Sequence, residues 1–176
     1  MDKQNLSDPF CGNIWYEGGL LNNGSHFINL LEYLLGPAEK LDCFHSEIFG
    51  YENEENIFGI LKFANGAVSL TPINSGGTKA NGIRIFFKSF SFEFSREVGG
   101  FSVRNLIRDE LYDNNSIFDT NQVLFPVNHA DLQSDFLKQV AKFLDGKHYV
   151  ACSGDQAFKT LSLIFDKKVY SLSSER

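Results

Sequence analysis

The segment Glu17–His26 constrains the fold most, because it combines two glycine breaks, two consecutive asparagines and a histidine. A strongly apolar run follows directly, as far as Leu35, and is closed by a Gly-Pro pair. Glycine and asparagine tolerate the positive φ angles of sharp turns, and a wide apolar stripe is typical of a buried helix. The pattern therefore predicts a turn and then a helix over 25–35, with Asn23 as its N-cap.

His26 stands in the first turn of this predicted helix. The backbone dipole at such a position favours a neutral imidazole, which suits proton transfer or hydrogen bonding near neutral pH. A packing or capping role is the alternative, and the residues alone leave both open.

Length and composition exclude several classes of protein. The 176 residues, of which 43% are hydrophobic and 22% charged, suit one globular domain with a sizeable core. A net charge of -6 argues against a nucleic-acid partner, because no basic patch is available to neutralise phosphates. No apolar run approaches the ~20 residues that span a bilayer, and the start of the chain does not resemble a signal peptide. We expect no membrane partner and no export.

Residues that commonly bind metals are scattered. The three cysteines, Cys11, Cys43 and Cys152, form no C-x-x-C pair, which fits a reducing compartment and predicts a cytoplasmic protein. The histidines other than His26 have no metal-ligand spacing with one another or with the cysteines. We therefore expect no metal site.

Alternating apolar residues predict strands in the middle of the chain. A loose alternation over 41–49 predicts the first strand. An Asn-Gly pair at 65–66 then divides the alternating run 57–72 into two halves. Asn-Gly favours a two-residue hairpin turn because both residues tolerate positive φ, and the predicted register places Phe63 opposite Val68.

A second hairpin is predicted further along the chain. Apolar residues occupy odd positions up to Phe87 and even positions from Phe90 onward. This change of parity predicts a two-residue turn, Lys88-Ser89, that places Phe87 opposite Phe90. Residues 98–128 are interpreted as one strand around 101–105 and a long loop.

Two helices are predicted near the end of the chain. The first, over 131–144, has an apolar stripe and Gly146 as its C-cap; the stripe consists of Leu132, Phe136, Val140 and Phe143. The second begins with a capping box at 153–156.

The order of these elements predicts an α+β fold, in which helices cover one face of an open, predominantly antiparallel β-sheet. The other face is then available for oligomerisation. We expect one domain over 15–176, after a loose lead-in over 1–14.

The string GGLLNNGSHFINLL at 18–31, followed by LLG at 34–36, resembles the G-G-x-x-x-D-x-G-x-H-x-x-D…L-G segment of the Gfo/Idh/MocA oxidoreductases. The later order is similar too, with an acidic loop, a strand, Asn-Gly, a further hairpin and a closing Ser-Gly-Asp helix. The resemblance extends from Trp15 to about Ser173. It covers only that family's C-terminal, substrate-binding and oligomerisation domain.

The resemblance implies roles for several residues. His26 would lie beside the substrate carbon that exchanges hydride with the nicotinamide, as general base or as hydrogen-bond partner of the reacting hydroxyl. Asn22 would orient it in place of the commoner aspartate, but without a charge to stabilise an imidazolium. Asn29 replaces another common aspartate as a substrate contact. The resemblance does not decide the role of Trp15 and Tyr16, which either line a sugar pocket by ring stacking or are buried in the turn.

Other family motifs are absent from the chain. No G-x-G-x-x-G follows a strand, and no E-K-P motif occurs. We therefore expect this chain alone to bind no dinucleotide and to have no dehydrogenase activity. NAD or NADP is implied for the complete enzyme, supplied by a separate Rossmann domain.

The resemblance favours the substrate-binding and oligomerisation domain of an NAD(P)-dependent oxidoreductase that acts on a sugar, polyol or sugar nucleotide. The expected partners are a sugar-like small molecule and further copies of the chain, in a dimer or tetramer formed through the open sheet face. The many phenylalanines are expected to make that face apolar. The alternatives are a non-catalytic assembly or small-molecule-binding module, and an unrelated α+β domain that matches by chance.

Overall fold

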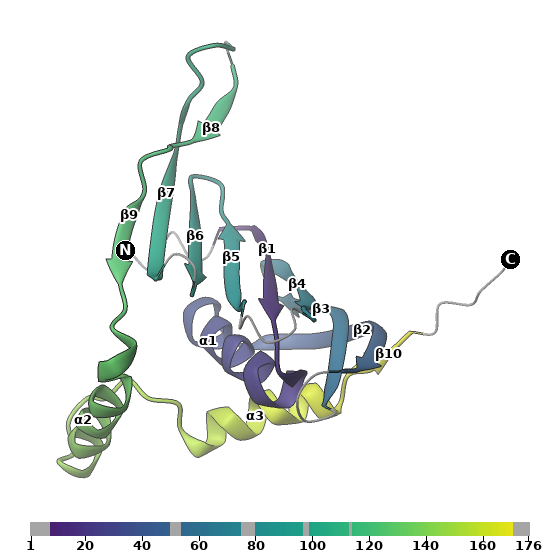
Figure 1. Ribbon diagram of the computed structural model, residues 1–176, viewed down its shortest axis with the longest axis vertical. Helices are drawn as coiled ribbons and strands as arrows, with labels where there is room; N and C mark the ends of the chain where they lie inside the picture. Colours follow the sequence, from purple (N-terminus) through teal and green to yellow (C-terminus); the bar gives the residue numbers. More distant parts are fainter. Residues whose placement is uncertain (1–7, 50–53, 75–79, 97–98, 113, 171–176) are drawn as a thin grey trace, which may run out of the picture.

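The computed structural model describes residues 8–49, 54–74, 80–96, 99–112 and 114–170, which form one open sheet with helices on one side (Figure 1). In chain order the elements are β1 (Phe10–Tyr16), the π-helical turn η2 (Gly19–Gly24), α1 (Ser25–Leu35), β2 (Ala38–Ile48), β3 (Glu55–Phe63), β4 (Gly66–Pro72), β5 (Gly82–Phe86), β6 (Phe90–Ser95), β7 (Gly100–Arg108), β8 (Ser116–Phe118), β9 (Val123–Pro126), the 3-10 helix η3 (His129–Asp131), α2 (Leu132–Leu144), α3 (Gly154–Phe165) and β10 (Lys168–Val169).

The described residues contribute ten strands to the sheet, in the order β10-β2-β3-β4-β1-β5-β6-β7-β8, with β9 paired to β7. Neighbouring strands are antiparallel except for β1 with β4 and β10 with β2. The predicted α+β class with an open, mostly antiparallel sheet is confirmed. The lead-in expected over 1–14 differs, because its last residues, from Phe10, begin the central strand β1. Residues 1–7 lie outside the described part of the chain.

The predicted β3–β4 hairpin is present, but its predicted register is wrong. Phe63 pairs with Gly66, and Val68 lies opposite Leu61. The reason is that Gly66 also pairs with Phe10 of β1, where an added Cβ would collide with the Phe10 carbonyl and ring. Gly66 therefore serves a close approach of two strands instead of the turn. The apolar residues still share one buried face, since the shift preserves parity.

The β5–β6 hairpin has the predicted register. The Phe87 N–H donates to the Phe90 carbonyl at 2.9 Å, and their rings stack with centroids 4.4 Å apart. The parity of the apolar positions was sufficient to locate this turn.

The stretch predicted over 98–128 contains more regular structure than expected in its described part, 99–112 and 114–128, while residues 98 and 113 lie outside the described residues. The predicted strand extends over Gly100–Arg108, and the expected loop contains β8 and β9, which both pair with β7. These two strands are three and four residues long, too short for a recognisable alternation in the sequence.

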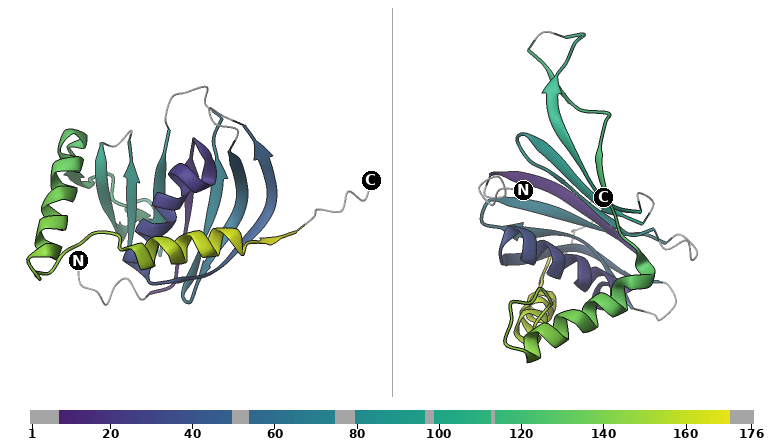
Figure 2. Two further views of the ribbon diagram at one scale, coloured as in Figure 1. Left: turned by 90° about the horizontal axis from the view of Figure 1, so that it is seen from below. Right: turned by 90° about the vertical axis from the view of Figure 1, so that its left-hand side faces the viewer.

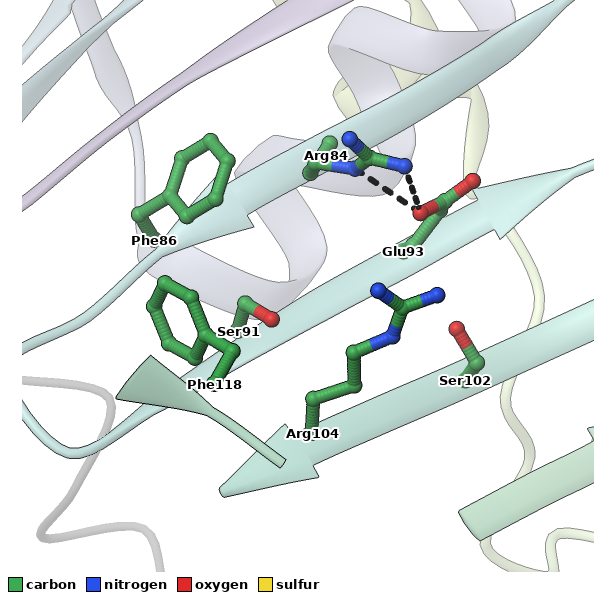
Figure 3. Close-up of a pocket in the computed structure, with 7 residues that line it drawn as sticks. All are labelled: Arg84, Phe86, Ser91, Glu93, Ser102, Arg104 and Phe118. Carbon is green, nitrogen blue, oxygen red and sulfur yellow. Dashed lines mark hydrogen bonds and ion pairs between the residues drawn. The ribbon is translucent and has the colours of Figure 1, made fainter. Parts of the chain in front are cut away.

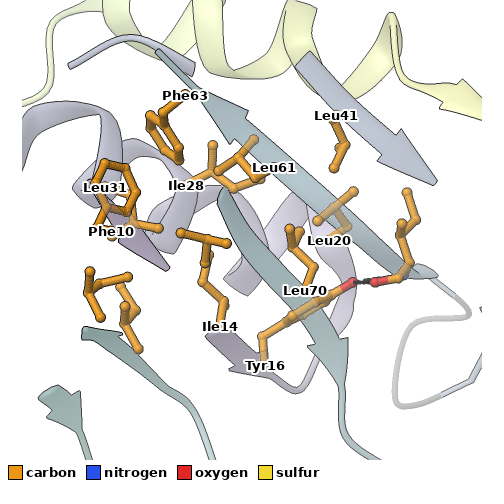
Figure 4. Packing of buried hydrophobic residues seen from close by; sticks show 14 of the residues in the cluster. Phe10, Ile14, Tyr16, Leu20, Ile28, Leu31, Leu41, Leu61, Phe63 and Leu70 are labelled. Atoms are coloured by element: carbon orange, nitrogen blue, oxygen red, sulfur yellow. Dashed lines mark hydrogen bonds between the residues drawn. The ribbon is translucent and has the colours of Figure 1, made fainter. Parts of the chain in front are cut away.

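The core lies between the sheet and two helices, α1 and α3, which cover one face (Figure 2). Figure 4 shows how residues from β1, β3 and β4 meet the buried face of α1. The largest fully buried side chains are Tyr16, Ile14, Leu20, Ile28, Leu31, Leu41, Ile57, Leu61, Leu70, Ile83, Ile85 and Ile164. Among the described residues, no helix is long and apolar enough to cross a membrane.

Helix α2 lies beyond the layer that α1 and α3 form and buries none of its residues (Figures 1 and 2). Its predicted stripe is largely exposed, with Phe136 56% and Phe143 57% accessible to solvent. The amphipathic pattern predicted the helix correctly, but its C-cap is Asp145, and the predicted Gly146 follows one residue later with a φ of 67°. The expected packing of this stripe in a helical layer on the sheet is not observed.

The expected apolar open face is also wrong for β5, β6 and β7. Phe92 pairs with Ile85 and Phe94 with Ile83, so both phenylalanines lie on the helix-covered face. The ring of Phe94 packs near the ring of Phe27 on α1, with the two ring centroids 6.4 Å apart. The alternate positions of these strands place mainly arginine, glutamate and serine on the open face, with Phe86 at the end of β5 as an apolar exception.

Candidate functional site

The turn before α1 is a six-residue π-helical segment, η2, that continues into the α-helix without a break. Gly18 and Gly19 introduce it with φ angles of 84° and 85°, in the left-handed region that glycine adopts most readily. π-Helical turns are rare and occur frequently at functional sites. The glycine pair therefore serves to place the wide turn, and with it Asn22, in front of the helix.

Asn23 is not the N-cap that the sequence predicted. Gly24 holds that position without a side-chain bond, because the backbone is already helical there. The Asn23 amide donates to the Glu17 carbonyl at 2.5 Å. Ser25 Oγ donates to two carbonyl oxygens of the π turn, at 2.7 and 2.9 Å. The side chains thus tie the turn together instead of capping the helix.

His26 is exposed in the first turn of α1, at a cleft of about 590 Å³. On the α1 side the cleft is lined by His26, Asn29, Leu30 and Tyr33. The opposite side comes from the far end of the chain, namely the segment 149–153 and the first turns of α3. The cleft therefore forms only when α3 packs beside α1.

Polar residues of this opposite wall were not predicted from the sequence. Asp155, Gln156 and Lys159 line the cleft, together with Tyr149. The capping box was the available signal, since it located the α3 N-terminus, and it is confirmed by mutual Ser153–Gln156 hydrogen bonds of 2.8 and 3.2 Å. The 149–153 segment is also tied to α2, because the Val150 N–H donates to Gln139 Oε1 at 2.9 Å.

Asn29 lines the cleft and also joins the two helices. Its amide donates to Thr160 Oγ1 at 3.2 Å, and that hydroxyl donates to Glu32 Oε2 at 2.5 Å. One donor of the Asn29 amide is thereby engaged on the α3 side. The residue positions the cleft wall as well as facing the cleft.

Asn22 is exposed in the π turn, but it is not among the residues that line the cleft. Its backbone N–H donates to Glu54 Oε2 at 3.3 Å. In the described part of the chain, no hydrogen bond joins the Asn22 side chain to His26. The structure places the two residues four positions apart across the η2–α1 junction without connecting them.

Trp15 and Tyr16 lie on opposite faces of the sheet, because they are neighbours in β1. The Tyr16 hydroxyl accepts from the Ile57 N–H at 2.7 Å and donates to the Ile57 carbonyl at 3.1 Å. Tyr16 is fully buried, and this burial raises its pKa well above the usual range. Trp15 covers Gly82 on the open face. Neither side chain lines the His26 cleft.

In the described residues, no cluster of three or more His, Cys, Asp or Glu side chains could hold a metal ion. The cysteines are all free: Cys43 is buried, whereas Cys11 and Cys152 are exposed. Cys152 lies in the cleft wall.

The family pattern described as "Oxidoreductase family, C-terminal alpha/beta domain" (GFO_IDH_MocA_C) matches residues 13–164. The matched region contains the π turn, His26 and nearly all of α3. The chain belongs to this family. Gfo/Idh/MocA membership thus agrees with the motif at 18–36. No curated protein matches the chain.

Solved structures share the fold of this Gfo/Idh/MocA domain. An NAD binding oxidoreductase from Klebsiella pneumoniae has a TM-score of 0.69 and 8% identity, over 94% of this chain and 57% of its own. A levoglucosan dehydrogenase in complex with NADH and L-sorbose has a TM-score of 0.65 and 13% identity, over 92% and 57%. The WlbA dehydrogenase from Bordetella pertussis, in complex with NADH and UDP-GlcNAcA, has a TM-score of 0.57 and 14% identity, over 93% and 54%. The chain spans little more than half the length of these proteins.

The glycine pair of this Gfo/Idh/MocA domain does not fit a dinucleotide phosphate. A Cβ on Gly19 would collide with the Glu54 carboxylate, which also accepts from the Asn22 N–H. A carboxylate at this position repels a pyrophosphate and occupies a backbone donor that would bind it. No other glycine-rich phosphate motif occurs in the sequence. The residues around Gly18 and Gly19 therefore do not fit the pyrophosphate of a dinucleotide.

Proposed function

We propose that the chain is the substrate-binding and oligomerisation domain of an NAD(P)-dependent oxidoreductase that acts on a secondary alcohol of a sugar, polyol or sugar nucleotide. The main support is the position of His26, exposed directly after a π turn at a cleft of about 590 Å³. That volume lies within the roughly 300–1,000 Å³ typical of small-molecule sites. Amide, hydroxyl and charged side chains around the cleft suit a polyhydroxylated ligand.

In this proposal His26 accepts the proton of the reacting hydroxyl, while the hydrogen on the same carbon leaves as hydride. Asn22 is a weaker partner than an aspartate, because an amide has no charge to stabilise an imidazolium. Asn29, Tyr149 and Lys159 contact the sugar from the two walls of the cleft. Trp15 and Tyr16 have no place in this version of the site.

The nicotinamide, which supplies the hydride acceptor, would be held by a Rossmann-type domain outside this chain. The relatives named as dehydrogenases with NADH support this arrangement, as does the misfit of Gly19 and Glu54 to a phosphate. The chain alone is then inactive, and the open sheet face, outside the polar surface over β5, β6 and β7, joins copies of it in a cytoplasmic dimer or tetramer.

The test is a binding measurement with the chain itself. Sugars, polyols and sugar nucleotides are titrated into isotopically labelled protein, and chemical-shift changes are followed by NMR. We expect one class of ligand to shift the signals of His26 and Tyr149, and His26→Ala to weaken its binding about tenfold or more. The matched control is His148→Ala. Ligands that shift only residues outside the cleft, or no binding at all, would reject the substrate-binding role.

A non-catalytic assembly module is the second candidate, and the exposed apolar stripe of α2 favours it. Light scattering separates the two ideas. A stable oligomer that binds no sugar supports assembly alone, whereas a monomer at high concentration counts against it.

A further inference from the structure

The open face of the sheet contains a small hollow over β5, β6 and β7, with a volume of about 120 Å³ (Figure 3). Its floor is formed by two buried serines, Ser91 and Ser102, on adjacent strands. Longer side chains surround them, namely Arg84, Phe86, Glu93, Arg104 and Phe118. The hollow exists because the smallest side chains lie at its centre and the longest at its rim.

One side of the rim is a fixed ion pair. Arg84 lies opposite Glu93 in the β5–β6 register, and its Nε donates to Glu93 Oε2 at 2.8 Å. Arg84 Nη2 bonds the same oxygen. Both donors therefore use Oε2, and Oε1 accepts from no residue in the described part of the chain.

Arg104 forms the other side of the rim. Its guanidinium extends between Glu93 and Ser102 in Figure 3. One nitrogen, Nη2, donates to Gln122 Oε1 at 3.3 Å, and the remaining donors of the group have no partner among the described residues. The rings of Phe86 and Phe118, with centroids 5.7 Å apart, close the end of the hollow.

We propose that this hollow binds a small monocarboxylate. Two arginines and one glutamate leave a formal charge of +1, which one carboxylate neutralises. The fork of Arg104 and the two serine hydroxyls donate to the carboxylate oxygens, while the short apolar part contacts Phe118. Glu93 repels a second negative charge, so that dianions are disfavoured.

The volume limits the ligand further. An apolar cavity of roughly 150 Å³ accepts benzene, with its six heavy atoms. A hollow of about 120 Å³ therefore suits a molecule of about five heavy atoms, such as acetate or glycolate. Because the hollow and the His26 cleft lie on opposite faces of the sheet, either can exist without the other.

The experiment is an NMR titration of the full 176-residue chain with acetate, at constant ionic strength maintained with chloride. We expect saturable shifts at the Ser91 and Ser102 amides, with a dissociation constant on the order of 1 mM, and at least about tenfold weaker binding of sulfate. Shifts that do not saturate, or that spread evenly over all basic residues, would overturn the proposal.

Variants test the chemistry. Arg104→Gln should weaken acetate binding about tenfold. Lys88→Met is the matched control, because it removes one positive charge from the exposed β5–β6 turn and should leave binding unchanged. Glu93→Gln keeps an acceptor for Arg84 but removes the repelling charge. The affinity for sulfate should therefore rise relative to the affinity for acetate. If Arg104→Gln and Lys88→Met weaken acetate binding equally, acetate responds only to the total charge of the protein, and the proposal is overturned.

Measuring the mass of the protein in solution distinguishes a free carboxylate from one that a second copy of the chain supplies. If a second copy fills the hollow with its own carboxylate, Arg104→Gln dissociates an oligomer and free acetate does not bind to the intact one. That result would overturn a site for a free ligand. An unchanged mass together with weaker acetate binding supports it.

Discussion

Thr160 Oγ1, on α3, donates a hydrogen bond of 2.5 Å to Glu32 Oε2, on α1. The second oxygen of Glu32 accepts from the Ala38 N–H at 3.3 Å, and the Asn29 amide donates to the threonine at 3.2 Å. Thr160 is only 2% exposed. A single hydroxyl thus connects the two helices that form the cleft and, through Glu32, the start of β2.

Replacing Thr160 by valine should therefore destabilise the fold. The change conserves shape but leaves the Glu32 carboxylate and the Asn29 amide without this partner, which typically costs about 1–3 kcal/mol. Urea unfolding measures the loss. Thr71→Val, the same change at an exposed position of β4, should stay within about 0.5 kcal/mol. Equal losses in the two variants would contradict a role for the hydroxyl.

Tyr16→Phe should remove both hydrogen bonds to Ile57 and lower the free energy of unfolding by about 1–3 kcal/mol. Burial raises the pKa of Tyr16 above its usual 10.0. A raised pKa stabilises the fold below the unfolded value, and this contribution is lost as pH rises past about 10. The wild-type protein should therefore lose stability more steeply there than Tyr16→Phe. Tyr33→Phe, at a residue that is 60% exposed, should retain the wild-type slope.

Gly19→Ala tests the π turn in front of His26. Alanine would be strained at a φ of 85° and would also meet the Glu54 carboxylate, whereas Gly36→Ala combines a similar φ of 94° with open space. Strain alone costs roughly 1–2 kcal/mol. Gly19→Ala should therefore be the more damaging variant in urea unfolding. A comparable loss in both would show that contact with Glu54 is unimportant.

The features predicted correctly depend on residues close together in sequence. The Ser153–Gln156 capping box and the Phe87–Phe90 pair each need only a few neighbouring positions. The register at Gly66 depended instead on the Phe10 carbonyl of β1, a contact that no local pattern contains. The Asn-Gly pair correctly predicted a hairpin, but the close approach of Gly66 to β1 changed the position of its turn.

The same distinction applies to the site. The motif predicts His26 as a site residue, and this role stays a prediction; the structure shows only that His26 lines the cleft. Lys159 and Tyr149 reach the same cleft only through packing of α3 beside α1. Tyr16 stands directly before the motif, yet strand alternation and the bond to Ile57 place it in the core. The predicted stripe of α2 identified a helix correctly, but amphipathicity does not specify which surface will cover it.

The ion pairs of Asp42 predict that the protein loses stability at acidic pH. Its side chain is 4% exposed, and hydrogen bonds from Lys40 and Lys62 lower its pKa from 3.8 to about 2. A lowered pKa stabilises the fold above the unfolded value, so this contribution is lost as pH falls from about 4 to about 2. Asp42→Asn should flatten the pH dependence of unfolding in this window. Asp135→Asn, which affects an exposed pair with Lys138, should retain the wild-type slope; a flattened slope in both variants would exclude Asp42 as the cause.

Alanine substitutions of phenylalanine should separate the core from the apolar stripe of α2. Phe63 is 6% exposed, and Phe63→Ala should cost about 3–5 kcal/mol through lost burial and a cavity. Phe136 is 56% exposed, so Phe136→Ala should change the free energy of unfolding of a monomer by less than about 0.5 kcal/mol. If copies of the chain cover the stripe, light scattering should instead show a lower mass for Phe136→Ala and a concentration-dependent loss of stability. A large loss in a protein that stays monomeric would mean that α2 packs on its own chain.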